Sequence, residues 1–390
     1  MSARGLARAV NIEDVRRLAH RRLPRAVTDF IEGGSEDELT LGRNREAFRS
    51  LTLVPRALAD VSNRDQSTTL LGTPVKSPIV LAPVGLAALA HPSIGEVAAA
   101  RAAANVGIIS TLSSSSGRSL EEVGASCTGP KWFQLYVWRD RRLTQDIVER
   151  ARAAGYLALC LTVDVQVSAR RERDLHNGFV VPPKPRLSQT GDLVLHAGWF
   201  RELVSAEARG RGITMGSFSA ENLGMRGRLR MIDIVNDLFD PSVSWRDLEW
   251  LKEIWGGPLV IKGIMTGPDA RRCIDSGANA VWVSNHGGRQ LDGVSASMTA
   301  LPAVVDAVSG DGEVYIDGGI RRGSDVVKCI ALGAKACMIG RPYVYGLAAG
   351  GQAGVEKVIR LLMSEIDTTM GLLGRPTLKD LDATAVGHPA

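Results

Sequence analysis

Cysteine is scarce in this sequence and offers no framework for disulfides. The 390 residues contain five cysteines, an odd number without a CxxC pair: Cys127, Cys160, Cys273, Cys329 and Cys337. Most lie within apolar strand or helix patterns. They are therefore expected to be buried, reduced thiols.

Long apolar runs and basic tracts are also missing. The longest apolar stretch, PIVLAPVGLAALA, is shorter than ~18 residues and is broken by Pro83 and Gly85, so no membrane span is predicted. The N-terminal segment lacks the apolar core of a signal peptide, which favours a cytoplasmic protein. The net charge is +5, but the basic residues are dispersed among acidic ones. This pattern disfavours nucleic-acid binding and suits an anionic small substrate or cofactor.

The sequence does contain a repeat of short strands. Runs rich in valine, isoleucine and leucine occur at 79–83, 108–112, 132–136, 157–163, 259–262, 280–284, 313–317 and 336–340. Segments with apolar residues at helical spacing separate most of them. Eight strand–helix repeats predict an α/β protein with a (β/α)8 barrel, the TIM barrel. A doubly wound sheet is the alternative, but its glycine fingerprint is absent, since GRGITMG at 210–216 has the wrong spacing.

Two segments fall outside this repeat. Residues 1–60 have helical patterns and are expected to cap one end of a single barrel domain (61–374), which a tail (375–390) follows. The step after the fourth strand is unusually long and predicts an insertion at about 165–257, over the catalytic face. Within it, LVLHAGWFRELV, with Trp199 and Phe200, has an amphipathic pattern compatible with packing on the barrel or with contact to a membrane or a partner.

Polar residues gather at the predicted carboxyl ends of the strands, where TIM-barrel enzymes carry their chemistry. Each alone has an ordinary structural explanation, such as helix capping. Their shared position at one end of the barrel predicts an active site. They are Ser113, Ser114, Gln134, Tyr136, Thr162, Asp164, Lys262, Ser284, His286, Arg289, Asp317, Gly340 and Arg341.

The loops after the last two strands predict a phosphate site. Both contain glycine, at Gly318, Gly319 and Gly340. In this fold such loops bind phosphate through backbone N–H groups and a helix N-terminus. Arg321 and Arg341 add guanidinium groups suited to phosphate oxygens, which a role of the glycines in turns alone would not explain.

His286 is the only one of six histidines at the catalytic end of a strand, in the segment SNHGGRQLD (284–292). Gly287 and Gly288 are expected to leave space around it and to let the backbone approach a ligand. No second histidine or cysteine lies at ligand spacing, which disfavours a metal site. We therefore expect His286 to act as a general base, with Asp164 orienting it and Arg289 binding a carboxylate.

Together these motifs resemble the FMN-dependent α-hydroxy acid oxidases and dehydrogenases, the family of glycolate oxidase and of lactate and mandelate dehydrogenases. The resemblance extends from about Asn11 to Gly374 and rests on SNHGGRQLD, DGGIRRGSDV, WFQLYVWRD and the RRERD that follows TVD. It implies a (β/α)8 barrel, FMN, oxidation of an (S)-2-hydroxy acid to a 2-oxo acid, and a homotetramer.

The resemblance also implies residue roles. It makes His286 the base and Asp164 its partner, and it has Arg171 and Arg289 bind the substrate carboxylate. Tyr136 would donate a hydrogen bond to the substrate, and Lys262 would stabilise negative charge at the pyrimidine end of the flavin. FMN would contact Pro83, Val84, Gly85, Ser113, Gln134, Tyr136, Thr162, Lys262 and Ser284, and its phosphate Asp317, Gly318, Gly319, Ile320, Arg321, Gly340 and Arg341.

The chain departs from the family pattern near the substrate. Phe30, in TDFIEGG, replaces a tyrosine that helps to bind the carboxylate, a loss of about 1–3 kcal/mol if the oxygen is left unpaired. The segment VQVSARRERD (165–174) is closer to the mandelate dehydrogenases. Glycolate enzymes carry alanine at the position of Gly85 and tryptophan at that of Ser115, so the pocket is expected to be wider and the substrate aromatic or bulky, like mandelate.

Two other functions stay open on the sequence alone. They are flavin-dependent maturation of a small peptide or cofactor precursor, which Phe30 allows, and a non-catalytic flavin-binding scaffold. The electron acceptor also stays open among oxygen, a quinone and a protein carrier. Contact of the insertion with a membrane would favour a dehydrogenase.

Overall fold

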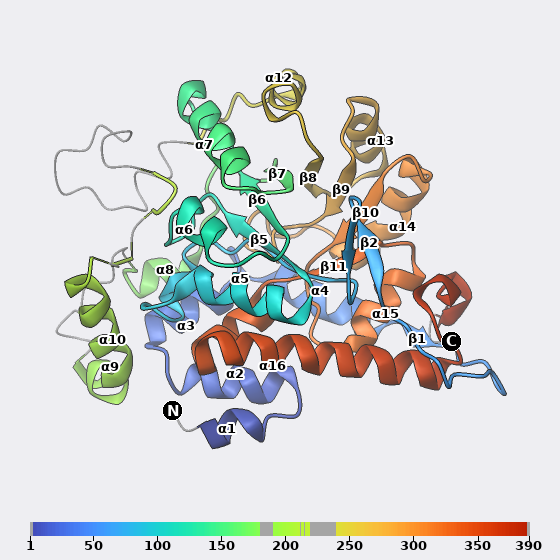
Figure 1. The fold of residues 1–390 in the computed structure, drawn as a ribbon, viewed down its shortest axis with the longest axis horizontal. Helices are drawn as coiled ribbons and strands as arrows, with labels where there is room; N and C mark the ends of the chain where they lie inside the picture. The colour runs from blue at the N-terminus through green and yellow to red at the C-terminus, as the bar shows by residue number, and fades with distance from the viewer. Residues whose placement is uncertain (1–2, 180–189, 211, 214, 219–238, 388–390) are drawn as a thin grey trace.

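The computed structural model contains a closed barrel of eight parallel strands (Figure 1). It describes residues 3–179, 190–210, 212–213, 215–218 and 239–387. Each predicted run overlaps one strand, and the strands follow one another around the ring in chain order. The TIM barrel is thereby confirmed and the doubly wound sheet is wrong. The strands are β4 (Ile79–Leu81), β5 (Ile109–Ser113), β6 (Lys131–Leu135), β7 (Ala158–Thr162), β8 (Leu259–Ile264), β9 (Ala280–Val283), β10 (Glu313–Ile316) and β11 (Ala336–Ile339).

Helices surround this barrel and bury the outer faces of the strands. Inside the barrel, large side chains such as Trp132, Trp282 and Tyr315 fill a separate apolar cluster, so the barrel is a packed core. Both faces of each strand are therefore apolar, which explains the continuous apolar runs in the sequence. The surrounding helices are α5 (Gly95–Val106), α6 (Leu120–Ala125), α7 (Arg141–Ala153), α12 (Trp245–Trp255), α13 (Gly267–Asp275), α14 (Ser297–Val308), α15 (Gly323–Ala331) and α16 (Arg341–Leu373).

Several helix ends have the expected local signals. The side chains of Ser119, Asp140 and Thr266 accept hydrogen bonds from the first turns of α6, α7 and α13. The long α16 consists of two helical segments, because Gly350 and Gly351 have non-helical backbone angles. A short 3-10 helix, η1 (Ala87–Leu89), follows β4.

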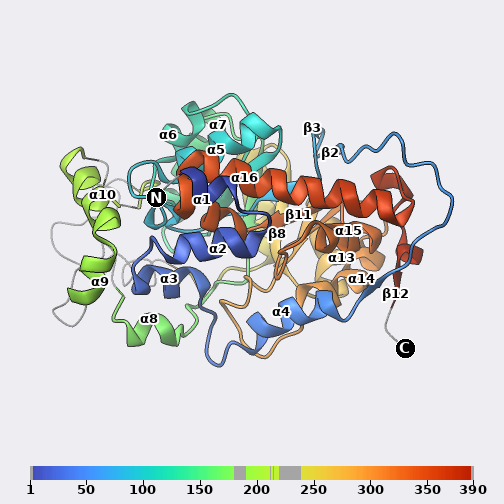
Figure 2. The same ribbon diagram turned by 90° about the horizontal axis from the view of Figure 1, so that it is seen from below.

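The N-terminal segment contributes four helices, α1 (Ala3–Ala7), α2 (Ile12–His20), α3 (Arg25–Glu32) and α4 (Leu39–Arg49). Figure 2 shows α1 and α2 along α16, against which both pack. Helix α4 is joined to the loop after β9, because the Asp292 carboxylate accepts hydrogen bonds from the backbone N–H groups of Leu39 and Thr40. The N-terminal helices therefore reach the carboxyl ends of the strands, where the site lies.

Small sheets complete the fold at the barrel's periphery. The hairpin β2 (Thr68–Leu70) and β3 (Thr73–Val75) places Leu70 and Val75 in the cluster inside the barrel. Strand β1 (Thr52–Leu53) pairs with β12 (Val386–Gly387) near the C-terminus, which also contains the 3-10 helices η3 (Leu378–Asp380) and η4 (Ala383–Ala385). All five cysteines are free, and four of them are buried, as expected.

The insertion after β7 contributes α8 (Glu172–His176), α9 (Thr190–Leu195) and α10 (Ala197–Ala208). Trp199 is buried and donates a hydrogen bond from Nε1 to the carbonyl of Leu89 (2.8 Å), and Phe200 packs edge-on against its ring. Of the two alternatives for this segment, the aromatic pair therefore packs on the barrel. The exposed large apolar side chains among the described residues of this insertion are Val167, Leu175, Val194, Leu195 and Val204. Among the described residues, no helix is long and apolar enough to cross a membrane.

Candidate active site

A histidine–aspartate pair stands at the carboxyl ends of β9 and β7. His286 Nδ1 lies 3.0 Å from Asp164 Oδ1. A neutral imidazole that donates from Nδ1 leaves Nε2 free to accept a proton. His286 has a left-handed backbone conformation (φ 59°), and its N–H donates to Ser284 Oγ (3.1 Å). Left-handed conformations are uncommon for residues other than glycine, and they cluster at functional sites.

A buried polar network beside this pair connects β8, β9 and β10. Lys262 Nζ donates to Ser284 Oγ (2.9 Å), and Ser284 Oγ donates to Asp317 Oδ1 (2.8 Å). Lys262 Nζ also lies 3.9 Å from Asp164 Oδ2 and 3.8 Å from Asp317 Oδ2. One buried cation is thus balanced by two carboxylates, and the lysine is held at a fixed place in the site.

The surroundings set the protonation states of the pair. Burial lowers the pKa of His286 below its ordinary value, and the nearby Asp164 carboxylate opposes that shift only in part. Burial by itself would raise the pKa of Asp164, but the charges of Lys262 and His286 lower it. Near neutral pH, a neutral imidazole therefore lies beside an ionised carboxylate, which is the combination a general base needs.

Cationic and phenolic groups gather on the same side of the pair. Arg289 Nη1 donates to the carbonyls of Phe30 (2.7 Å) and Gly33 (2.8 Å), and its guanidinium lies 5.1 Å from the centre of the Phe30 ring. Burial and the charges of Arg171 and Arg341 lower the pKa of Arg289. Repulsion among three cations would be relieved by a bound anion. Burial, and then the Asp164 charge, raise the pKa of Tyr136, so its hydroxyl stays a hydrogen-bond donor.

These groups share one cavity of about 240 Å³. Five predicted residues do not line it but adjoin residues that do. Asp164 contacts His286, Ser284 accepts a hydrogen bond from Lys262, and Ser113 accepts one from Ser115 N. Gln134 accepts a hydrogen bond from Ser113, and Thr162 lies beside Lys262 on the neighbouring strand. The structure brings the other predicted residues together at the cavity surface. They are Phe30, Pro83, Val84, Gly85, Ser115, Tyr136, Arg171, Lys262, His286, Arg289, Asp317, Gly318, Gly319, Ile320, Arg321, Gly340 and Arg341.

The wall of the cavity fits a flavin. Gln134 Nε2, Thr162 Oγ1 and Arg321 Nε are buried without a hydrogen-bond partner among the described residues. Buried polar atoms in native proteins almost always have partners, so such atoms point to a ligand. The carbonyl oxygens and ring nitrogens of a flavin, together with phosphate oxygens, offer partners of the required types. Gln134, Thr162 and Lys262 could hold the ring, and Ile320, Arg321, Gly340 and Arg341 the phosphate.

Two glycines of these loops have a structural role that the sequence did not predict. A Cβ on Gly319 would lie 2.0 Å from the carbonyl oxygen of Asn44, and one on Gly288 would lie 2.6 Å from the backbone nitrogen of Leu41. Both glycines have positive φ. They therefore permit the close approach of α4. Gly319 also lines the cavity, and the contact of the phosphate loop with FMN stays a prediction.

Arg341 also has partners that the sequence did not predict. Its guanidinium donates to the carbonyls of Ile31, Gly33 and Gly287, all at 2.9 Å. The side chain thus ties α3 to the loop that carries His286. Arg341 also lines the cavity, and its contact with the FMN phosphate stays a prediction.

Several lining residues carried no signal in the sequence. Met215 and Phe239 come from the insertion, and Val165, Ser168 and Gln290 flank the catalytic pair. Phe239 packs edge-on against Tyr136, with ring centres 5.1 Å apart. An aromatic residue followed closely by Asp-Pro in a long insertion is the only local hint for Phe239, and it is weak.

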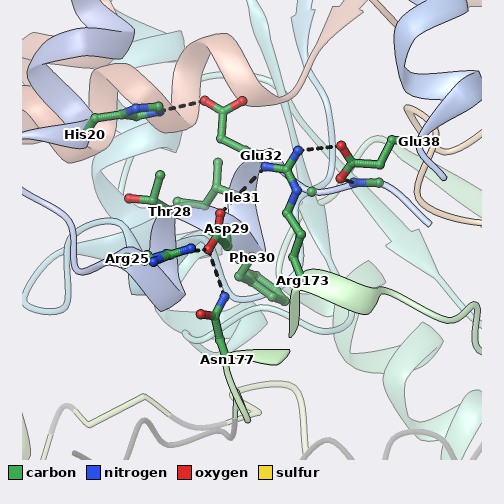
Figure 3. Close-up of polar contacts among 12 residues, drawn as sticks. His20, Arg25, Thr28, Asp29, Phe30, Ile31, Glu32, Glu38, Arg173 and Asn177 are labelled. Carbon is green, nitrogen blue, oxygen red and sulfur yellow. Dashed lines mark hydrogen bonds and ion pairs between the residues drawn. The ribbon is translucent and has the colours of Figure 1, made fainter. Parts of the chain in front are cut away.

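The replacement at Phe30 is accommodated by a second aromatic ring. Phe30 stacks on Phe179, which follows α8, at a centre distance of 4.8 Å. Figure 3 shows how α3 is tied to this segment, since Asp29 accepts a hydrogen bond from Asn177 Nδ2 (2.9 Å) and pairs with Arg173. Arg173 also pairs with Glu38. An apolar stack therefore occupies the place expected for a substrate-binding hydroxyl.

The chain is similar to known proteins over nearly its whole length. Residues 19–388 match the family model described as FMN-dependent dehydrogenase. An L-lactate oxidase of Nostoc sp. is 44% identical over 379 residues, covering 96% of this chain and 97% of that protein. A glycolate oxidase of Spinacia oleracea is 41% identical over 376 residues, covering 96% and 95%. The crystal structure of a monotopic membrane protein, (S)-mandelate dehydrogenase, has a TM-score of 0.91 at 38% identity, covering 98% and 100%.

Proposed function

Because the chain belongs to the family of FMN-dependent dehydrogenases and is an FMN-dependent 2-hydroxy acid oxidase or dehydrogenase, we propose that its preferred substrates are aromatic or bulky (S)-2-hydroxy acids. One observation carries this proposal. Gly85 and Ser115 lie against each other in the cavity wall, since a Cβ on Gly85 would lie 3.3 Å from that of Ser115. Two small residues at one place leave room for a side chain larger than a hydrogen or a methyl group.

Apolar side chains line the rest of this space. Leu86, Ala87, Met215 and Phe239 all line the cavity. The insertion therefore does fold back over the site, and besides the polar Ser168 and Arg171 it contributes a flexible methionine and an aromatic edge. Burial of a phenyl ring there would contribute about 25 cal/mol per Å² of apolar surface.

We assign the chemical roles from the geometry of the cavity. Arg289 and Arg171 would bind the substrate carboxylate, and Tyr136 would donate to a substrate oxygen. His286 Nε2 would take the proton that leaves as the hydroxyl becomes a carbonyl, and Asp164 would stabilise the resulting imidazolium. FMN, when bound, supplies the acceptor for the two electrons and the second hydrogen that the substrate loses. Lys262 would stabilise negative charge at the flavin end of the cavity.

Anaerobic mixing of the FMN-loaded protein with a panel of 2-hydroxy acids tests the function. Loss of the oxidised flavin absorbance marks a substrate, and the acid that bleaches it fastest identifies the class. Absence of bleaching with every acid would favour maturation of a peptide or cofactor precursor instead. The homotetramer stays a prediction, and the electron acceptor is identified by measuring hydrogen peroxide during turnover in air.

Mandelate is expected to exceed glycolate in kcat/KM by at least ~10-fold, which corresponds to about 1.4 kcal/mol of transition-state binding. The reason is the apolar space beside Gly85 and Ser115. Steady-state rates with glycolate, lactate and mandelate measure the ratio. The variant Ser115→Trp should fill the space and reverse the preference, and glycolate as the best substrate of the unchanged protein would contradict the proposal.

The pH dependence of kcat/KM should report the His286–Asp164 pair. Because burial lowers the pKa of His286, the base is expected to be active down to a pH below 6.5, and kcat/KM should fall only as the pH drops through that lower value. Asp164 raises the pKa of His286, so Asp164→Asn should move this fall to still lower pH. The substitution should also reduce the maximum value of kcat/KM in the profile by at least ~10-fold, because the His286 imidazolium loses the carboxylate that stabilises it.

Steady-state profiles of the unchanged protein and of Asp164→Asn measure both effects. The exposed carboxylate of Asp140, which caps α7, gives a matched control, and Asp140→Asn should leave the profile in place. A fall of kcat/KM that Asp164→Asn shifts to higher pH would show that the pair does not act as described.

A further inference from the structure

A buried glutamate lies behind one wall of the active-site cavity. Glu96, at the start of α5, is only 5% exposed and lies outside the cavity lining. Its Oε1 accepts hydrogen bonds from two backbone N–H groups, those of Ala88 (3.1 Å) and Gly117 (2.9 Å). Ala88 belongs to η1, which follows β4, whereas Gly117 lies in the loop after β5. One carboxyl oxygen therefore joins the loops that follow two neighbouring strands of the barrel.

These two loops form the wall against which the side chain of a bulky substrate would pack. The loop after β4 contributes Gly85, Leu86 and Ala87 to the cavity lining, and the loop after β5 contributes Ser115. The loops meet directly at the cavity, since Leu86 N donates to the carbonyl of Ser115 (2.9 Å). Glu96 joins them a second time, at residues that lie behind this lining. The distance between the loops, and with it the shape of the wall, depends on both connections.

The loop after β5 also carries part of the insertion. Gly216 N donates to the carbonyl of Ser116 (2.9 Å), and a Cβ on Gly216 would lie 2.1 Å from the carbonyl carbon of Arg118, so the two segments approach closely. Met215, the residue before Gly216, lines the cavity. A shift of this loop would therefore move Ser115 and Met215 together.

The second carboxyl oxygen of Glu96 adds nothing to the stability of this region. Oε2 is buried and has no hydrogen-bond partner among the described residues. Burial also raises the pKa of Glu96. The carboxyl group is closely packed, since a Cβ on Gly117 would lie 3.6 Å from Oε1, 3.7 Å from Oε2 and 2.6 Å from the Cβ of Ala88. Because an unpaired buried polar atom lowers stability, the feature that accounts for Glu96 is the pair of hydrogen bonds that Oε1 accepts from the two loops.

We propose that Glu96 is a positioning residue for substrate selection, which joins the loops after β4 and β5 and so fixes the apolar wall that receives the side chain of the 2-hydroxy acid. This inference rests on the proposed function, which places that side chain beside Gly85 and Ser115. Glycolate has no side chain to place against the wall, whereas the phenyl ring of mandelate would contact it. The two acids should therefore respond differently to the loss of Glu96. Since Oε1 alone accepts both bonds, the carboxamide oxygen of a glutamine can replace it.

Steady-state kinetics of the FMN-loaded protein with mandelate and glycolate test this role. Glu96→Ala should lower the ratio of kcat/KM for mandelate to that for glycolate at least 5-fold, chiefly through a higher KM for mandelate, because His286, Asp164 and Arg289 lie on other loops. Glu96→Gln should keep the ratio within twofold of the unchanged protein. Glu96→Asp, shorter by one methylene, should change the ratio in the same direction as Glu96→Ala and replaces that variant if it does not fold. The matched control is Glu122→Ala, since Glu122 is an exposed glutamate in the first turn of α6.

Hydrogen exchange of the FMN-loaded proteins tests the two bonds without turnover. The amides of Ala88 and Gly117 should exchange at least 10-fold faster in Glu96→Ala than in Glu96→Gln. Unchanged exchange at both amides, an equal loss of kcat/KM for the two acids, or a ratio that Glu96→Gln changes as much as Glu96→Ala would overturn the proposal. If the unchanged protein oxidises neither acid, the proposed function fails, and dissociation constants of phenylglyoxylate and glyoxylate, measured through the flavin spectrum, replace the two rates. Equal effects of Glu96→Ala on these two constants would overturn the positioning role separately.

Discussion

Replacement of His286 by alanine is expected to lower kcat for the best hydroxy acid by about 10²–10⁴-fold, the range that a positioned general base contributes. His286 is the group that lies 3.0 Å from Asp164 with its second nitrogen free. The variant should still bind FMN, because the cofactor contacts expected from Gln134, Thr162, Lys262 and the phosphate loops are unchanged. Single-turnover bleaching of the flavin measures the loss in the chemical step, and the flavin spectrum measures cofactor content.

The matched control is His176→Ala, which removes an exposed histidine from α8. It should turn over like the unchanged protein. Turnover of His286→Ala within threefold of that control would remove the assignment of His286 as the base. Loss of FMN from His286→Ala would show a structural role for this residue instead.

The second large effect is expected at Arg289. Arg289→Met should lower kcat/KM for a hydroxy acid by about 10²–10³-fold, because removal of one partner of a buried ion pair with the substrate typically costs 2–5 kcal/mol. Arg289→Lys should recover only part of this loss, since a lysine keeps the charge but not the forked geometry. Steady-state kinetics with mandelate as the varied substrate measures the change.

The neutral analogue of the substrate provides the control for Arg289. With mandelamide, which has no carboxylate charge, Arg289→Met should change kcat/KM by less than about threefold relative to the unchanged protein, because no ion pair is lost. An equal loss for the acid and the amide would mean that Arg289 acts by holding the carbonyls of Phe30 and Gly33 in place. That result would contradict the proposal that Arg289 binds the substrate carboxylate.

The barrel and most of the site could be predicted from the sequence for a physical reason. Parallel barrel strands are buried on both faces, so each leaves a continuous apolar run such as AVWV at 280–283. The carboxyl end of each run then fixes which residues meet at the catalytic face. His286 follows β9, Asp164 follows β7 and Lys262 lies near the end of β8, and the structure places them close together as this rule requires.

What could not be predicted depends on contacts between distant segments. The partners of Arg341 are backbone carbonyls of α3 and of the His286 loop, and backbone carbonyls leave no trace in a sequence. Position 319 favours glycine because a Cβ there would collide with the carbonyl oxygen of Asn44. Met215 and Phe239 belong to an insertion without periodicity, so nothing marks their approach to the cavity. The burial of Trp199 could not be predicted either, because an aromatic residue in an amphipathic pattern is compatible with packing inward and with exposure.

The joint between α4 and the loop after β9 bears on the order in which the protein assembles. Asn44 and Asn285 exchange two amide hydrogen bonds, each 2.8 Å long, across 241 residues of sequence, and Ser35 N–H donates to the carbonyl of Gly288 (2.9 Å). Closing so long a loop costs chain entropy before the contact is gained, so contacts of this kind form late in folding. During synthesis α4 leaves the ribosome long before its partner loop exists. The left-handed turn at His286 therefore gains its support only when the two distant parts of the chain have met, and catalytic competence is among the last properties the nascent chain acquires.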